Sequence, residues 1–207
     1  MELLPHVIIL GLVGFIVTIS WSPTSSLFSW HPTLMSVAFL GLQCESILLF
    51  HPRFSPVTNH ALRVKLHQIF QIVGFVLGSI GMVIIYILKE NAGKPHISSW
   101  HALFGLSAMI LTLIQLVGGL PLIYSQIRKI LPMSKSLGEL KRKHAQMGLI
   151  TVICGLTTVG LAFYSNWFIK KEFHRIYQNV AFGAVTTIIG VLFAQVYHGR
   201  LSVENQN

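Results

Sequence analysis

Four of the ten histidines stand at the same structural position, at or near the start of successive apolar segments. They are His31, His67, His101 and His144, separated by 36, 34 and 43 residues, and each interval is about one membrane span plus a loop. A neutral imidazole is the commonest metal ligand in proteins. A single histidine at such a position more often rests among lipid headgroups as an amphipathic residue. Its repetition on four consecutive segments favours a bound metal or cofactor.

The order of the segments sorts these histidines into two pairs. Consecutive membrane helices run in opposite directions, so the second and fourth segments start at one membrane face and the third and fifth start at the other. We therefore expect His31 to meet His101 near one face and His67 to meet His144 near the other.

Two imidazoles that approach from opposite helices suit the iron of a haem, which accepts one nitrogen at each axial position. Zinc or copper normally needs three or four ligands, and each pair offers only two. The chain contains no Asp that could complete such a set. The pattern therefore favours two haems over a bare metal ion.

The elements that carry these pairs are long and apolar. Hydrophobic residues make up 53% of the 207-residue chain and charged residues only 10%. A helix needs about 20 apolar residues to cross the roughly 30 Å hydrocarbon core of a bilayer. The sequence therefore predicts an all-α membrane protein, a single domain over residues 1–207, with a central four-helix bundle (spans two to five) that binds two haems. The six transmembrane helices are expected at residues 5–22, 31–50, 67–88, 101–124, 144–166 and 176–198.

The basic residues predict the orientation. Ten Lys and Arg lie on the side of the N-terminus and five on the other, so both termini are expected in the cytoplasm. Because these cations occupy short loops between spans, the formal charge of +9 reflects topology and does not indicate nucleic-acid binding. The first segment is expected to be a span, not a secretory signal, because no Lys or Arg precedes it.

Local signals place the helix starts. Ser136 and Glu139 form a predicted capping box, which puts His144 inside the fifth helix. Pro32 suits the first turn of the second helix, and Ser98 or Ser99 is expected to cap the fourth.

Small residues within the spans have two interpretations. Gly105 and Gly148 follow His101 and His144 by one helical turn and would leave room for a flat macrocycle, although small residues also mark ordinary packing of membrane helices. Cys44 and Cys154 fall inside spans, where we expect small apolar behaviour and no disulfide.

The stretch "FSWHPTLM" around His31, with a histidine opening each of the next three spans, resembles the cytochrome b561 family of di-haem transmembrane reductases. The similarity covers about residues 24 to 200 and is strongest to the short cytochrome b561 domain-containing branch. It implies two non-covalent b haems in the pairs given above. It also implies electron transfer from cytoplasmic ascorbate to a ferric chelate or monodehydroascorbate across the membrane, with membrane lipid around the chain, possible homodimers and an endomembrane location.

The resemblance also suggests residues around the two haems. The haem of His67 and His144 would be the cytoplasmic one. Lys65 matches a family position that faces ascorbate, whereas a second basic position of the family is Ala61 here. The further candidates for ascorbate binding are Arg63, Arg142 and Lys143, and all four basic residues are also explained by the positive-inside rule.

On the other side, Lys94 and His96 precede His101 and are candidates for contact with the acceptor, or are solvated loop residues. Glu45 is the one Asp, Glu, Lys or Arg inside a predicted span. It would either relay the proton that ascorbate releases or, as we prefer, emerge into the interface near Arg53.

Two other functions remain open from the residues alone. The histidines could form a relay in a metal-ion or proton transporter, which would carry no haem. Alternatively, the protein could be a haem-bearing membrane anchor for a soluble redox partner, in which case ascorbate would not reduce the isolated protein.

Overall fold

The computed structural model describes residues 2–21, 26–130, 136–170 and 175–197, and the regular secondary structure of this part of the chain is all helical. The α-helices are α1 (Leu4–Ser20), α2 (Trp30–Met35), α3 (Cys44–Leu48), α4 (His60–Asn91), α5 (Trp100–Ile123), α6 (Ser125–Ile130), α7 (Leu137–Ala162), α8 (Asn166–Ile169) and α9 (Arg175–Val196). A short 3₁₀ helix, η1 (Leu27–Ser29), precedes α2, and a π-helix, η2 (Ser36–Gln43), joins α2 to α3.

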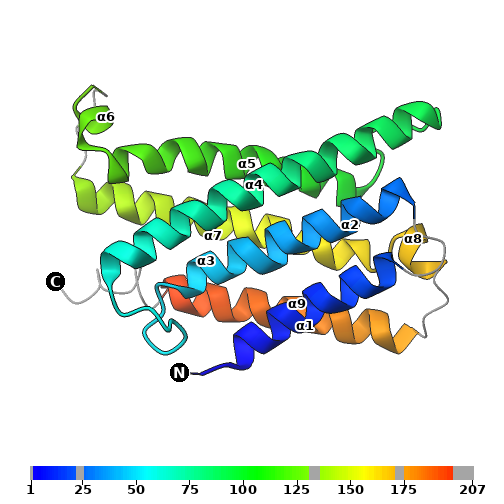
Figure 1. Ribbon diagram of the computed structural model, residues 1–207, viewed down its shortest axis with the longest axis horizontal. Helices are drawn as coiled ribbons and strands as arrows, with labels where there is room; N and C mark the ends of the chain where they lie inside the picture. Colours follow the sequence, from blue (N-terminus) through cyan, green and yellow to red (C-terminus); the bar gives the residue numbers. More distant parts are fainter. Residues whose placement is uncertain (1, 22–25, 131–135, 171–174, 198–207) are drawn as a thin grey trace.

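The long helices lie side by side with alternating directions (Figure 1). Helix α5 packs along α7, and α4 packs along α2 and η2, so these elements form the central bundle. Helices α1 and α9 pack against each other and against this bundle from one side. The backbone N–H of Glu2 donates to the carbonyl of Arg53 at 2.9 Å, so the start of α1 lies near the loop before α4. We call this the N-terminal end of the bundle, where α4 and α7 also begin.

Four described helices are long and apolar enough to cross a membrane: α4, α5, α7 with α8, and α9. Helix α1 is apolar but only 17 residues long. The second predicted span is helical from Trp30 to Leu48, divided into α2, η2 and α3. The all-helical prediction is confirmed, and the count of six spans stays a prediction.

Apolar side chains cover the outside of the bundle as well as its inside. Helix α4 has a mean hydropathy of 2.3 over its most apolar window, yet only 17% of that window is buried. A large apolar surface of this kind is rare on a water-soluble monomer and is expected of a helix that faces lipid.

The observed helix starts confirm the capping signals. Ser136 Oγ accepts from Glu139 N–H at 3.2 Å, and Glu139 Oε2 accepts from Ser136 N–H at 2.9 Å, which is the expected capping box. Ser99, not Ser98, caps α5. Helix α4 starts at His60, seven residues before the predicted third span, because Asn59 caps the helix with its side-chain oxygen on Leu62 N–H.

The two cysteines are free thiols, as expected. Cys44 is fully buried, and its Sγ donates to the carbonyl of Phe39 at 3.2 Å within the π-helical turn. Cys154 Sγ donates to the carbonyl of Phe104 at 3.3 Å and so links α7 to α5.

Candidate functional site

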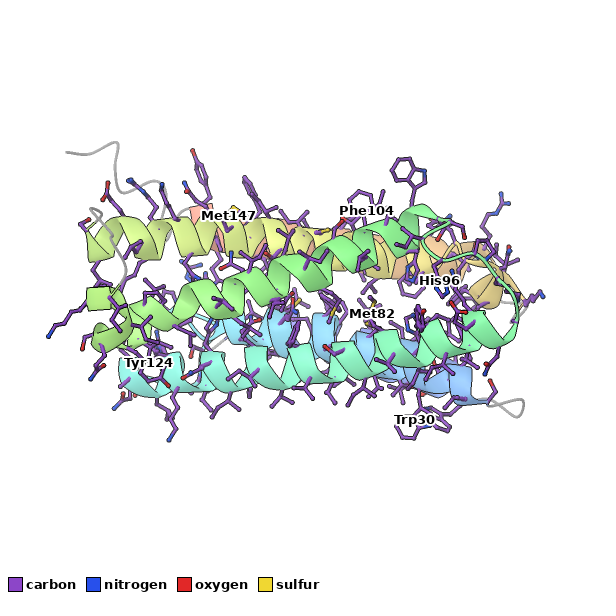
Figure 2. All side chains as sticks on the ribbon, turned by 90° about the horizontal axis from the view of Figure 1, so that it is seen from above. Trp30, Met82, His96, Phe104, Tyr124 and Met147 are labelled. Carbon is purple, nitrogen blue, oxygen red and sulfur yellow. The ribbon has the colours of Figure 1, made fainter. Side chains whose placement is uncertain are left out.

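His31 and His101 face each other at the end of the bundle opposite the N-terminal end. His31 lies in the first turn of α2 and His101 in the first turn of α5, and their ring centroids are 6.4 Å apart with planes at 78°. Figure 2 shows Trp30 and Phe104 toward this end of the bundle, and Tyr124 at the other. The predicted first pair is therefore brought together across two helices.

His67 and His144 meet in the same way at the N-terminal end. Both lie about two turns inside their helices, α4 and α7, and their ring centroids are 6.3 Å apart with planes at 77°. The edge of Phe50 contacts the His67 ring, with centroids 5.3 Å apart. The structure thus reproduces both pairs that the order of segments predicts.

The separation within each pair fits two imidazoles on one metal ion. Because a bond from a metal to an imidazole nitrogen is about 2 Å long, two rings bound at opposite sides of one ion have centres about 6 Å apart. The observed 6.4 Å and 6.3 Å match this spacing. Among the described residues, no group of three or more His, Cys, Asp or Glu could hold a metal ion by itself.

Hydrogen bonds fix three of the four rings. The Nδ1 atoms of His31, His67 and His101 lie 2.9, 3.1 and 2.9 Å from the backbone carbonyls of Gly81, Ser46 and Thr158, respectively. A carbonyl oxygen only accepts, so Nδ1 must carry the proton and donate it. The neutral ring then presents the lone pair of Nε2, and metal-binding histidines in proteins are usually held in this manner.

His144 differs from the other three. Its Nδ1 atom is buried and has no hydrogen-bond partner within the described part of the chain. The ring lies against α5 at Gly119, where a Cβ would stand 3.4 Å from His144 Cε1.

The two glycines that follow the ligand candidates behave differently. A Cβ at Gly148 would have no neighbouring atom within 4 Å, so the backbone one turn after His144 could be approached closely by a flat group. A Cβ at Gly105 would lie 3.3 Å from Thr158 Cγ2, so this glycine serves the contact between α5 and α7. The expectation of room for a macrocycle therefore fits Gly148 and not Gly105.

The candidate donor-side cations all lie at the N-terminal end, in the first turns of α4 and α7. Lys65 and Lys143 are exposed, while Arg63 and Arg142 are half-buried. Arg63 Nε donates to the carbonyl of Val57 and so also fastens the preceding loop. In that loop, His51 stacks on Phe54 with ring centroids 3.9 Å apart. Partial burial and the Arg53 guanidinium lower the pKa of His51, so its ring is neutral near pH 7 and adds no positive charge.

The candidate acceptor side contains a compact polar cluster. His96 Nε2 lies 2.7 Å from Glu90 Oε1, and its ring stacks on Tyr86 with centroids 4.6 Å apart. Lys94 is exposed. Lys89, which the sequence did not indicate as a candidate, donates from Nζ to the carbonyl of Pro95 at 3.0 Å.

Glu45 has a partner that the sequence did not indicate, and its emergence into the interface near Arg53 stays a prediction. Its Oε2 lies 2.7 Å from Nδ1 of His6, whose Nε2 lies 3.2 Å from the carbonyl of Phe54. Arg53 instead lies 3.7 Å from Glu2. The reason is geometric: α1 passes beside α3 and presents His6, for which the sequence indicated no partner.

These features define a class of protein: an apolar helical bundle that holds two half-buried imidazole pairs at opposite ends. The chain belongs to the eukaryotic cytochrome b561 family, whose model matches residues 30–169. It is 34% identical to the transmembrane reductase CYB561D2 of Bos taurus over 165 residues, which cover 79% of this chain and 72% of the relative.

More distant relatives agree with this assignment. The chain is 32% identical to the probable transmembrane reductase CYB561D1 of Homo sapiens over 168 residues, which cover 80% of this chain and 71% of the relative. It is 28% identical to the plasma membrane ascorbate-dependent reductase CYBRD1 of Mus musculus over 101 residues, 49% of this chain and 35% of the relative. Family membership makes the protein an integral membrane oxidoreductase of transmembrane electron transfer and implies b-type haem.

Proposed function

We propose that the protein binds two b haems and transfers single electrons from cytoplasmic ascorbate to a non-cytoplasmic acceptor, either a ferric chelate or monodehydroascorbate. The proposal includes six membrane spans in one domain, both termini in the cytoplasm and an endomembrane location. His67 and His144 would hold the cytoplasmic haem, and His31 and His101 the non-cytoplasmic one.

The observation that carries the proposal is the presence of two imidazole pairs at opposite ends of the bundle. In α4, fourteen residues separate His67 from Gly81, whose carbonyl holds His31. At 1.5 Å per residue, the levels of the two pairs are roughly 21 Å apart along the helix. Two one-electron centres at these levels suit electron transfer across most of a bilayer.

The chain would position the cofactor, and the bound haem iron would supply the one-electron chemistry. The carbonyls of Gly81, Ser46 and Thr158 orient three of the rings and keep Nε2 available as the ligand atom. No acid–base or nucleophilic group is needed for the transfer of an electron.

Positive charges at both ends favour anionic reactants. Ascorbate is an anion at neutral pH, and Lys65, Arg63, Arg142 and Lys143 surround the end that holds His67 and His144. The name of the mouse relative, an ascorbate-dependent reductase, supports this donor. At the opposite end, Lys94 and Lys89 would attract an anionic ferric chelate, and the ring of His96 would be a further contact.

The test is a spectrum of purified protein with ascorbate. We expect a reduced b-type spectrum, and His67→Ala or His144→Ala should remove one centre while leaving the other detectable. A colourless preparation, or full haem content in the double variant His31→Ala with His101→Ala, would contradict the proposal. Loss of metal-ion or proton flux without any haem band would favour a transporter, and haem that ascorbate does not reduce would favour a membrane anchor for a redox partner.

A further inference from the structure

Each of three helical segments carries a histidine of one pair and, further along, a carbonyl that holds a histidine of the other pair. The number of residues between these two levels, which we call the pair levels, differs by one among the segments. Fourteen residues separate His67 from Gly81 in α4, and fourteen separate His144 from Thr158 in α7. Between His31 and Ser46 there are fifteen. The π-helix η2 lies within this third interval and accommodates the extra residue, since a π-helical turn contains more residues than an α-helical one.

The π-helical segment presents Phe39 to the centre of the bundle. Phe39 is only 4% exposed, and a Cβ on Gly155 of α7 would stand 2.9 Å from its Cε1 and closer still to its Cδ1. A Cβ on Gly78 of α4 would lie 3.8 Å from Phe39 Cε2 and 3.0 Å from Met109 Sδ. The ring and the thioether therefore occupy the space that the two glycines leave open.

These four residues, Phe39, Gly78, Met109 and Gly155, form what we call the central layer. Phe39 follows His31 by eight residues and Met109 follows His101 by eight, while Gly78 and Gly155 follow His67 and His144 by eleven. A shift of eight residues is a rise of about 12 Å and a shift of eleven is about 16.5 Å, so the backbones of Phe39 and Met109 lie near the middle of the roughly 21 Å between the pair levels, and those of Gly78 and Gly155 lie nearer the level of His31 and His101.

Cys44 supports this arrangement from one turn further along. Its thiol donates to the carbonyl of Phe39, a group that the π-helical turn removes from the regular α-helical hydrogen-bond series. The backbone of Phe39 is thereby held in the position from which its ring reaches Gly155.

We propose that Phe39, with Met109 beside it, is a positioning residue for electron transfer between the two histidine pairs. The inference rests on the proposed function. In that function an electron would pass from the haem that His67 and His144 would hold, which would be oxidised, to the haem that His31 and His101 would hold, which would be reduced. Phe39 keeps the intervening space filled and gains or loses no electron itself.

The physical reason is packing density. A void has no atoms with which its lining can make contact, and electronic coupling between two centres weakens when the matter between them is replaced by a gap. Because two of the helices have glycine at this level, their backbones lie close to the Phe39 ring of the third. Removing part of this ring would leave a gap in the protein that separates the two histidine pairs.

The experiment follows reduction of the purified holoprotein by ascorbate in a stopped-flow spectrometer. Wild-type protein should show a first phase, reduction of the centre near the donor, and a second phase, reduction of the far centre. In Phe39→Leu we expect the first phase and both midpoint potentials to be retained and the second phase to slow several-fold, because the substitution leaves an unfilled volume. Phe163→Leu makes the same change at a buried ring outside the central layer and should leave both phases unchanged.

Met109→Ala leaves an unfilled volume on the other side of the central layer and serves if Phe39→Leu fails to bind haem; it should slow the second phase in the same direction. A second phase at the wild-type rate in either variant, with potentials unchanged, would overturn the inference alone. A wild-type protein with one haem or none would overturn the proposed function as well.

A second measurement does not depend on electron transfer. Gly155→Ala should lower the Tm because its Cβ collides with the Phe39 ring, and Phe39→Leu in the same chain should recover part of that loss. If the Tm change of the double variant equals the sum of the changes in the two single variants, the contact between Phe39 and Gly155 is contradicted, and the central layer with it.

Discussion

The four imidazole rings are held unequally, and the difference lies in single hydrogen bonds. Carbonyl oxygens of Ser46, Gly81 and Thr158 fix Nδ1 of three rings, while Nδ1 of His144 is buried without a partner in the described residues. A hydrogen bond at Nδ1 makes the ring a better ligand and fixes its orientation. The pair at the N-terminal end therefore has one well-held ligand, and the pair at the opposite end has two.

If both pairs hold haem as proposed, we expect the two haems to be retained unequally. Loss of an outer partner of a metal-binding histidine typically costs about 10–100-fold in metal affinity, so the haem of His67 and His144 should be lost first. A haem-scavenging apoprotein added in excess measures the two rates, and variants lacking His31 or His67 assign them. Equal rates, or earlier loss from the His31–His101 pair, would show that the unpaired Nδ1 has no such effect.

The contact between His6 and Glu45 should stabilise the fold. The side chains are only 17% and 23% exposed, so a carboxylate left without its partner would be poorly hydrated. We expect His6→Ala to destabilise by about 1–3 kcal/mol, the cost of an unsatisfied, partly buried polar group. Glu45→Gln added to His6→Ala should recover part of the lost Tm, whereas an equal or larger loss in the double variant would contradict the pairing.

At the scale of elements, the helices were predictable and their irregularities were not. Apolar length gave the segments, and the Ser136–Glu139 capping box gave the start of α7. The π-helix η2 could not be predicted, because no residue type marks an inserted residue.

The site was predictable to a similar extent. Residue types and segment order gave the two histidine pairs, but the groups that hold Nδ1 are backbone carbonyls, which every residue possesses. Only the helix register could have indicated them. Each carbonyl lies fourteen or fifteen residues after one histidine and accepts from a histidine on the neighbouring helix. The contact of Glu45 with His6 was missed because it depends on how α1 lies against α3.

The loop before α5 contains a strained residue. Ile97 has φ of 51°, and a left-handed conformation costs an L-residue roughly 1–2 kcal/mol. Because Asn adopts this conformation more readily, we expect Ile97→Asn to raise the Tm, and Ile97→Val, which keeps the β-branch, to give no gain. Since Ile97 is 51% exposed, little burial is lost. A lower Tm for Ile97→Asn would show that the loop does not hold this backbone conformation in solution.

At the scale of the whole molecule, the basic residues and the histidine pairs are both distributed along the length of the bundle. The two histidine pairs mark opposite ends of the bundle, and the basic residues are concentrated at the end that holds His67 and His144. One asymmetry can therefore fix the orientation in the membrane and also attract an anionic donor to the nearer pair. The two effects are separable, because orientation is set during insertion, whereas attraction of the donor depends on ionic strength.

Charge reversal at Lys65 tests the attraction of the anionic donor. In Lys65→Glu we expect the KM for ascorbate to rise several-fold with little change in kcat, because the charge guides binding and does not take part in electron transfer. Added salt should reduce the difference in KM between Lys65→Glu and wild type, since the Debye length falls to roughly 3 Å at 1 M. Lys170→Glu makes the same change at the opposite end of the bundle and should leave the KM for ascorbate unaltered. An equal rise in both variants would mean that net charge matters and the position of Lys65 does not, and a KM that stays constant in Lys65→Glu would remove this residue from the donor site.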